Sequence, residues 1–170
     1  MIIGFVAAIL GGSPPVEPPA CTCLCMIPQL TSMVHLRPGD SVTTVIFSRR
    51  VRDRTRIAVD TAGTYDIRAV GYWHDADIRT DADGFSLGKV KAIAWVPMWV
   101  GSLVRRKRDE RYFALIGQID SLSDDRFKIG TKLIGWHPPS SGELVTFAND
   151  VRFAYGNNRG CLALTVVRKT

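Results

Sequence analysis

The sequence predicts an all-β fold, a sandwich or jelly roll of about eight strands. Short runs rich in β-branched and aromatic residues recur along the chain with turn signals between them, and helix-period patterning is scarce. In the clearest run, residues 64–71, apolar residues such as Tyr65 alternate with charged ones such as Asp66, so one face is apolar. Strands of this kind bury their apolar faces by packing as two sheets around one core.

The other expected strands follow the same pattern. They cover residues 42–48, 55–60, 112–119, 127–130, 143–148 and 161–167. Turn residues precede the first of them, at Pro38-Gly39-Asp40, and Ala62-Gly63 separates two others. A polar loop rich in Asp is expected over residues 72–84, and a second loop over residues 149–160.

The first 36 residues differ in composition from the rest of the chain. They contain no Lys or Arg, and Glu17 is their one charged side chain. The apolar residues 1–10 fit the central part of a signal peptide without its cationic start, and they are too few to span a bilayer. We therefore expect residues 1–36 to be a poorly structured segment, either a signal remnant or a fragment boundary, and residues 37–170 to form the sandwich. The compartment stays open, with an extracellular or periplasmic location favoured.

The chain is basic, with a net charge of +6 and a pI of about 9.4. Such a charge suits an anionic partner, but the basic residues are spread out except for the run at residues 105–108. We therefore expect no nucleic-acid partner. The run is expected to be a solvated loop, and the alternative is a patch that faces phosphate or lipid. Membrane contact would come only through this run or through the N-terminal segment.

The sequence offers little support for catalysis, and we expect a protein that is not an enzyme. It contains no nucleophile elbow and no phosphate-binding loop. Its three histidines and four cysteines lack the spacing of a zinc or redox motif. Four carboxylates lie in the polar loop: Asp75, Asp77, Asp81 and Asp83. They could supply the pair that a glycosidase needs, but a solvated or calcium-lining turn is the simpler interpretation.

The loop over residues 149–160 has the composition of a calcium-binding loop. It contains the carboxylate of Asp150, the amides of Asn157 and Asn158, and two glycines that allow a tight path. Calcium takes six to eight hard oxygen ligands, whereas zinc prefers the thiolates and imidazoles that this loop lacks. From composition alone, an ordinary turn stays open as the alternative, because Asn and Gly tolerate positive φ angles.

Several segments together resemble the bacterial galactophilic lectin family in order and spacing. These segments are residues 114–117, 127–130, 141–144, 149–150 and 155–160, with a weaker similarity at residues 64–73. The resemblance covers roughly residues 40–170 and implies a galactose-binding-like β-sandwich.

The resemblance also implies a ligand set. Calcium would be held by Asp150, the backbone carbonyl of Ala154, Asn157 and Asn158, with a further backbone carbonyl near Asp75. In the family, the sugar coordinates the ion through two ring hydroxyls. Those hydroxyls are neutral oxygen ligands that replace water, so binding buries no charge. The residues expected to contact the sugar here are Asp150, Asn157 and His74.

The chain departs from the family in two places. The family's His and Gln on the middle loop have no clear counterparts, because residues 75–84 contain no Gln and His74 is the one nearby imidazole. The lectins also have no counterpart of residues 89–111. In this insertion Trp95, Trp99 and Val100 favour a core or interface role, and stacking on a sugar is the alternative.

The hypothesis from the sequence is a calcium-dependent carbohydrate-binding domain for galactose-type sugars, with Ca²⁺ as its cofactor. The alternative is a non-catalytic interaction or structural domain that keeps the sandwich and has lost sugar binding. A homo-oligomer would fit the first hypothesis, because multivalency makes weak sugar sites useful.

Overall fold

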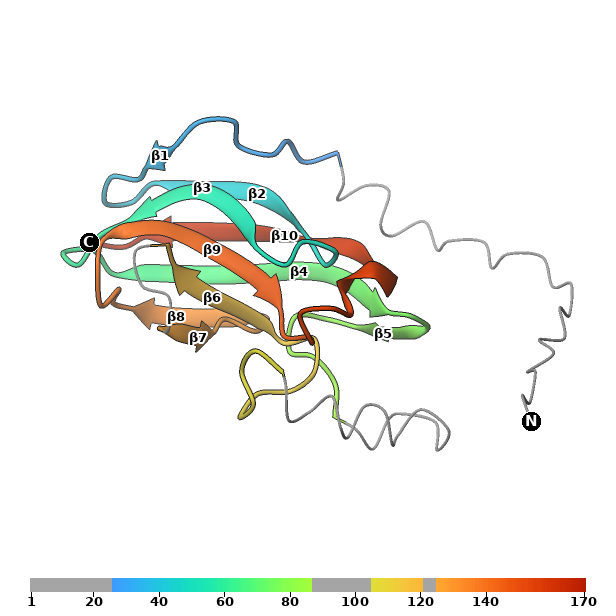
Figure 1. Ribbon diagram of the computed structural model, residues 1–170. Coiled ribbons are helices and arrows are strands. Elements are labelled where there is room, and N and C mark those ends of the chain that lie inside the picture. The colour runs from blue at the N-terminus through green and yellow to red at the C-terminus, as the bar shows by residue number, and fades with distance from the viewer. Residues whose placement is uncertain (1–25, 87–104, 121–124) are drawn as a thin grey trace, which may run out of the picture.

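The computed structural model describes residues 26–86, 105–120 and 125–170, and they form a β-sandwich of two sheets (Figure 1). This confirms the predicted fold class. No α-helix occurs within these ranges; the one helical turn among them is the 3-10 turn η2, Tyr155–Asn157. No helix in the described part of the chain is long and apolar enough to cross a membrane.

One sheet is built around two long strands. It has the order β2-β10-β4-β5, and β8 also pairs with β4. Its strands are β2 (Ser41–Phe47), β4 (Tyr65–Asp75), β5 (Ile78–Thr80), β8 (Lys132–Trp136) and β10 (Asn158–Arg168). β10 pairs with β4 without a register shift from Asn158↔Asp75 to Arg168↔Tyr65, so the two strands run together along the whole sheet.

The other sheet has the order β1-β3-β9-β6-β7. Its strands are β1 (Val34–His35), β3 (Asp53–Val59), β6 (Leu115–Ile119), β7 (Arg126–Lys128) and β9 (Gly142–Ala148). The register between β3 and β9 shifts between Arg54 and Ala58, which marks a β-bulge.

The core lies between the sheets and is formed by alternate residues of each strand. Tyr65, Ile67 and Trp73 of β4 are at most 1% exposed, whereas Val70 on the opposite face of the strand is 67% exposed. Such alternation is the pattern that predicted this strand. The Trp73 indole donates to the backbone oxygens of Asp81 (3.2 Å) and Phe113 (3.1 Å), so this large core residue has no unpaired N–H.

Four regions differ from the prediction. The polar loop expected over residues 72–84 instead continues β4 to Asp75 and turns back into β5. Residues 158–160, expected in a loop, open β10, and β8 was not predicted. In the run 112–119 regular strand begins only at Leu115, because Phe113 has a left-handed φ of 58°. In the first three of these regions, pairing with a distant strand outweighs local turn propensity.

The end of the N-terminal segment takes part in the sandwich. Val34 and His35 form β1, which pairs in parallel with β3, and Leu36 is 6% exposed. Leu30 and Val34 pack against the core. Residues 26–36 were expected outside the domain, and their apolar side chains explain why part of this stretch is held on it. The apolar residues 1–10 and the residues Trp95, Trp99 and Val100 lie outside the described residues.

Candidate functional site

Two of the acidic residues singled out in the sequence, Asp75 and Asp150, come together at one end of the sandwich. Asp75 is the last residue of β4, and Asn158, the first residue of β10, is its cross-strand partner. Asp150 follows the end of β9 in the other sheet. The candidate site therefore lies where the two sheets meet, beside η2 and the turn from β4 to β5 (Figure 1).

Two asparagine amides hold the two carboxylates. The Asn158 Nδ2 group donates to Asp150 Oδ2 (3.1 Å) and to the Ser48 carbonyl (3.2 Å). The Asn157 Nδ2 group donates to Asp75 Oδ1 (3.0 Å). The backbone N–H of Val151 donates to Asp150 Oδ1 (2.7 Å). The carboxylates are thereby fixed in orientation, and Asp75 contributes its side chain where the sequence predicted only a nearby carbonyl.

The ionised forms of the two carboxylates, Asp75 and Asp150, are disfavoured. Burial raises the pKa of Asp75 to about 6, and the nearby charge of Asp150 contributes to that increase, against the hydrogen bond from Asn157. Burial also raises the pKa of Asp150, against the hydrogen bonds from Val151 and Asn158. Neither carboxylate forms an ion pair with a basic side chain of the described residues. Two like charges held together in a low-dielectric place favour a bound cation or a bound proton.

A buried oxygen atom without a hydrogen-bond partner also favours a bound cation. Asn158 is fully buried, and its Oδ1 atom has no hydrogen-bond partner among the described residues. A buried acceptor left unpaired costs roughly 1–3 kcal/mol. A cation would accept an oxygen lone pair at this position, so the donor set of two carboxylates and an amide oxygen fits a hard ion such as calcium. No group of three or more His, Cys, Asp or Glu side chains that could hold a metal ion occurs in the described ranges, and the candidate site itself contributes two carboxylates.

Two of the predicted site residues lie less favourably. The Ala154 carbonyl, at the N-cap of η2, accepts the N–H of Asn157, the last residue of that turn (3.4 Å). His74 lies on β4 between Trp73 and Asp75, so strand alternation directs its side chain to the opposite face from Asp75. Its cross-strand neighbours there are Arg159 and Arg79. The structure thus brings Asp75, Asp150, Asn157 and Asn158 together and separates His74 from them.

The sequence did not single out two tyrosines that support the site. Burial raises the pKa of Tyr155 and of Tyr112 to about 12, and the charge of Asp150 adds to both increases. The Tyr155 hydroxyl donates to the carbonyl of Ala148, at the end of β9. Both hydroxyls therefore stay protonated beside the carboxylates. A tyrosine within the Asn-rich loop, between Ala154 and Gly156, was the available signal.

Asn149 connects the site to the basic run. It is fully buried, and its Oδ1 atom accepts the N–H of Lys107 (3.0 Å). Its Nδ2 group donates to the carbonyls of Lys107 (2.8 Å), Arg111 (2.9 Å) and Glu110 (3.3 Å). The turn at residues 105–111 is therefore docked against the loop that carries Asp150.

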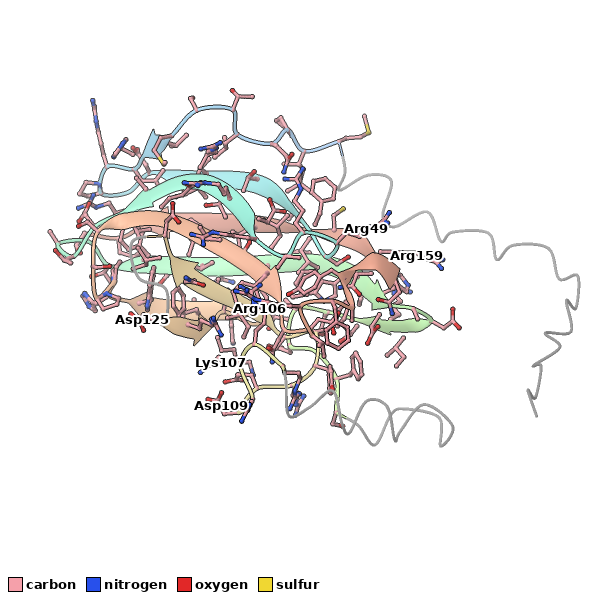
Figure 2. The ribbon with its side chains drawn as sticks, viewed as in Figure 1. Arg49, Arg106, Lys107, Asp109, Asp125 and Arg159 are labelled. Atoms are coloured by element: carbon pink, nitrogen blue, oxygen red, sulfur yellow. The ribbon has the colours of Figure 1, made fainter. Side chains whose placement is uncertain are left out.

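The basic run is consequently more ordered than the expected solvated loop. The Arg106 guanidinium lies 3.3 Å from the centre of the Phe147 ring and donates to the Val51 carbonyl. Arg105 forms a β-bridge with Val151 and stacks on the Tyr112 ring, 4.3 Å from its centre. Figure 2 shows Arg106 over the sheet face, and Arg49 and Arg159 at the end where β10 begins.

In the metal-free protein, stability is expected to increase as the pH falls from about 7 to about 5. The pKa of Asp75 is raised in the folded state, so folding favours its protonated form and ionisation between the unfolded and folded pKa values removes stability. Urea unfolding in EDTA at both pH values measures the change. Asp75→Asn should reduce this pH dependence, and an equal dependence in both proteins would contradict the assignment.

Comparisons with known proteins give a fold similarity and no family. No family model and no curated protein sequence matches the chain. Among solved structures, the chain resembles one described as the EclA N-terminal domain, a PllA-like lectin. The TM-score is 0.55 at 17% sequence identity, and the match covers 74% of this chain and 94% of that one. The comparison thus shows that the chain shares its β-sandwich fold with this lectin.

Proposed function

We propose that this protein is a calcium-dependent carbohydrate-binding domain. The observation that carries the proposal is the cluster of Asp75, Asp150 and the orphaned Asn158 Oδ1 atom. The likeness to a solved lectin supports the carbohydrate part. Galactose-type sugars are the first ligands to test, because the sequence resemblance points to a galactophilic family.

The residues of the chain would act in separate roles. Asp75, Asp150 and Asn158 would supply oxygen ligands, and bound calcium would supply coordination positions for two hydroxyls of a sugar. Asn157 would orient Asp75 through their 3.0 Å hydrogen bond. The hydroxyl protons of Tyr112 and Tyr155 are retained at neutral pH, so neither tyrosine adds a negative charge to the site.

Calcium is expected to raise the melting temperature of the protein by several degrees. A ligand at about one hundred times its Kd stabilises the folded state by about 2.7 kcal/mol. Asp150→Asn should abolish this increase while leaving the EDTA-treated protein folded, since it removes one of two repelling charges. Asp109→Asn is the matched control, because Asp109 is exposed and, among the described residues, forms an ion pair only with Lys107. Differential scanning calorimetry, with calcium and with EDTA, gives the readout.

Sugar binding is tested next on calcium-loaded protein. Isothermal titration with methyl galactosides, and with methyl mannosides for comparison, should show binding that EDTA and Asp150→Asn remove. The absence of any calcium-induced stabilisation would refute the metal site. Stabilisation by calcium without binding of any sugar would instead support an interaction domain that keeps the sandwich and the ion.

A further inference from the structure

A groove lined by arginine lies on the outer side of the β3 sheet. Its volume is about 390 Å³, and its walls are Arg50, Arg52, Arg54, Arg56, Gln29 and Leu30. Arg54 and Arg56 project from the outer face of β3, since the intervening Thr55 is buried. Arg50 and Arg52 precede the strand. No part of the candidate calcium site lines this groove.

The acidic partners of these arginines lie beneath them. Arg50 pairs with Asp53 (2.9 Å), whose side chain is 1% exposed. Arg54 pairs with Glu143 (2.6 Å), whose side chain is 2% exposed. Neither carboxylate lines the groove. The ion pairs therefore hold the guanidiniums in place while about half of each arginine side chain, 46% in both cases, stays exposed.

A third acidic residue also pairs with these arginines, but it does not neutralise their total charge. Asp120 pairs with Arg52 and with Arg54 (2.6 Å). Three carboxylates thus face four guanidiniums, and the described residues give the Arg56 guanidinium no ion pair or hydrogen bond. Each guanidinium carries five N–H donors, so unused donors stay available at the groove.

The backbone at Arg56 is unusual. Its φ is 60°, a left-handed conformation that is rare outside glycine, and it lies within the β-bulge between β3 and β9. Its N–H donates to Glu143 Oε1 (2.9 Å), which holds the bulge in place. Bulges re-aim side chains and are common beside functional sites. Here the bulge places the uncompensated guanidinium in the wall of the groove.

We propose that this groove binds the anionic groups, sulfate or carboxylate, of an acidic glycan. Guanidinium groups held by buried acids recognise such oxyanions through paired, charge-assisted hydrogen bonds. A single-stranded nucleic acid is the less suitable polyanion, because no aromatic side chain of the described residues lines the groove to stack a base. The proposal goes beyond the calcium site and extends the carbohydrate-binding function to a second, metal-independent contact.

The test uses the full chain and a heparin-type hexasaccharide in isothermal titration at low salt. Arg56→Gln should weaken binding about tenfold, and Arg56→Lys should weaken it less. The matched control is Arg68→Gln, which removes the same charge from an exposed position on β4 in the other sheet. It should change the affinity less than twofold. A desulfated hexasaccharide that retains its carboxylates separates sulfate from carboxylate recognition.

Several results would overturn the proposal. Equal losses in Arg56→Gln and Arg68→Gln would indicate diffuse charge attraction. Tighter binding of single-stranded DNA than of the hexasaccharide at the same salt concentration would replace the glycan with a nucleic acid. Failure of the calcium site is distinguishable, because in EDTA the hexasaccharide should still bind and Arg56→Gln should still weaken its binding. Circular dichroism of each variant checks that it is folded.

Discussion

Asn149→Ala is expected to lower the free energy of unfolding by about 3 kcal/mol or more. The substitution removes the side-chain partner of the Lys107 N–H and of the Glu110 carbonyl in a part-buried place. It also removes one of two partners of the Lys107 and Arg111 carbonyls, which keep the N–H groups of Glu110 and Ala114. Each buried polar group left unpaired costs roughly 1–3 kcal/mol, although water entering the gap offsets part of that. Guanidinium unfolding monitored by tryptophan fluorescence measures the loss.

The control for this prediction is Asn157→Ala in metal-free protein. It makes the same chemical change in the same loop, but Asn157 is exposed and its amide makes one hydrogen bond, to Asp75. Its effect should stay below about 1 kcal/mol. Hydrogen exchange should show faster exchange of the 107–111 amides in Asn149→Ala alone. Equal losses of stability in the two variants would contradict the role given to Asn149.

Gly84→Ala is the second substitution with a large expected effect, again about 3 kcal/mol. Gly84 has a φ of 72°, and a Cβ atom there would overlap the carbonyl oxygen of Tyr112 and the nitrogen of Ala114. These are backbone atoms fixed by pairing, because Phe85 donates to the Tyr112 carbonyl (2.8 Å). Neither can move without loss of a hydrogen bond, so overpacking adds to the backbone strain.

Gly39→Ala separates the two contributions. Gly39 also has a positive φ, 88°, but nothing lies within 4 Å of a Cβ atom built there. Its substitution should cost only the conformational strain, about 1 kcal/mol. Unfolding midpoints of both variants under the same conditions give the comparison. Equal costs would show that the close approach at Gly84 is relieved by small backbone shifts.

Much of the fold could be predicted because strand patterning is local. The runs 42–48, 55–60 and 143–148 match β2, β3 and β9 to within two residues. In each, apolar or β-branched residues recur between clear turn signals. The parts that were missed lie beside or contain turn residues: β4 continues past Gly71, where the predicted run ended, β8 contains Gly135, and the start of β10 contains Gly160. Local propensity disfavours a strand there, and cross-strand hydrogen bonds supply the stabilisation that outweighs it.

The candidate site, too, could be predicted only in part from local sequence. The sequence named Asp150, Asn157 and Asn158 because oxygen donors cluster in one short loop. It gave Asp75 only a backbone role and included His74, because neighbouring positions cannot be told apart until the register is known. The β4–β10 register decides this, since it pairs Asp75 with Asn158 and strand alternation then directs His74 to the other face.

The sequence by itself determined the sandwich class and the chemistry of the C-terminal loop, since both follow from residue types at short spacing. Only the tertiary structure decided which acids meet, because Asp75 and Asp150 approach each other through the packing of two sheets. It also decided how the arginines are arranged. The arginines of β3 look like scattered surface residues in the sequence, but buried acids beneath them and the bulge at Arg56 arrange them along one groove.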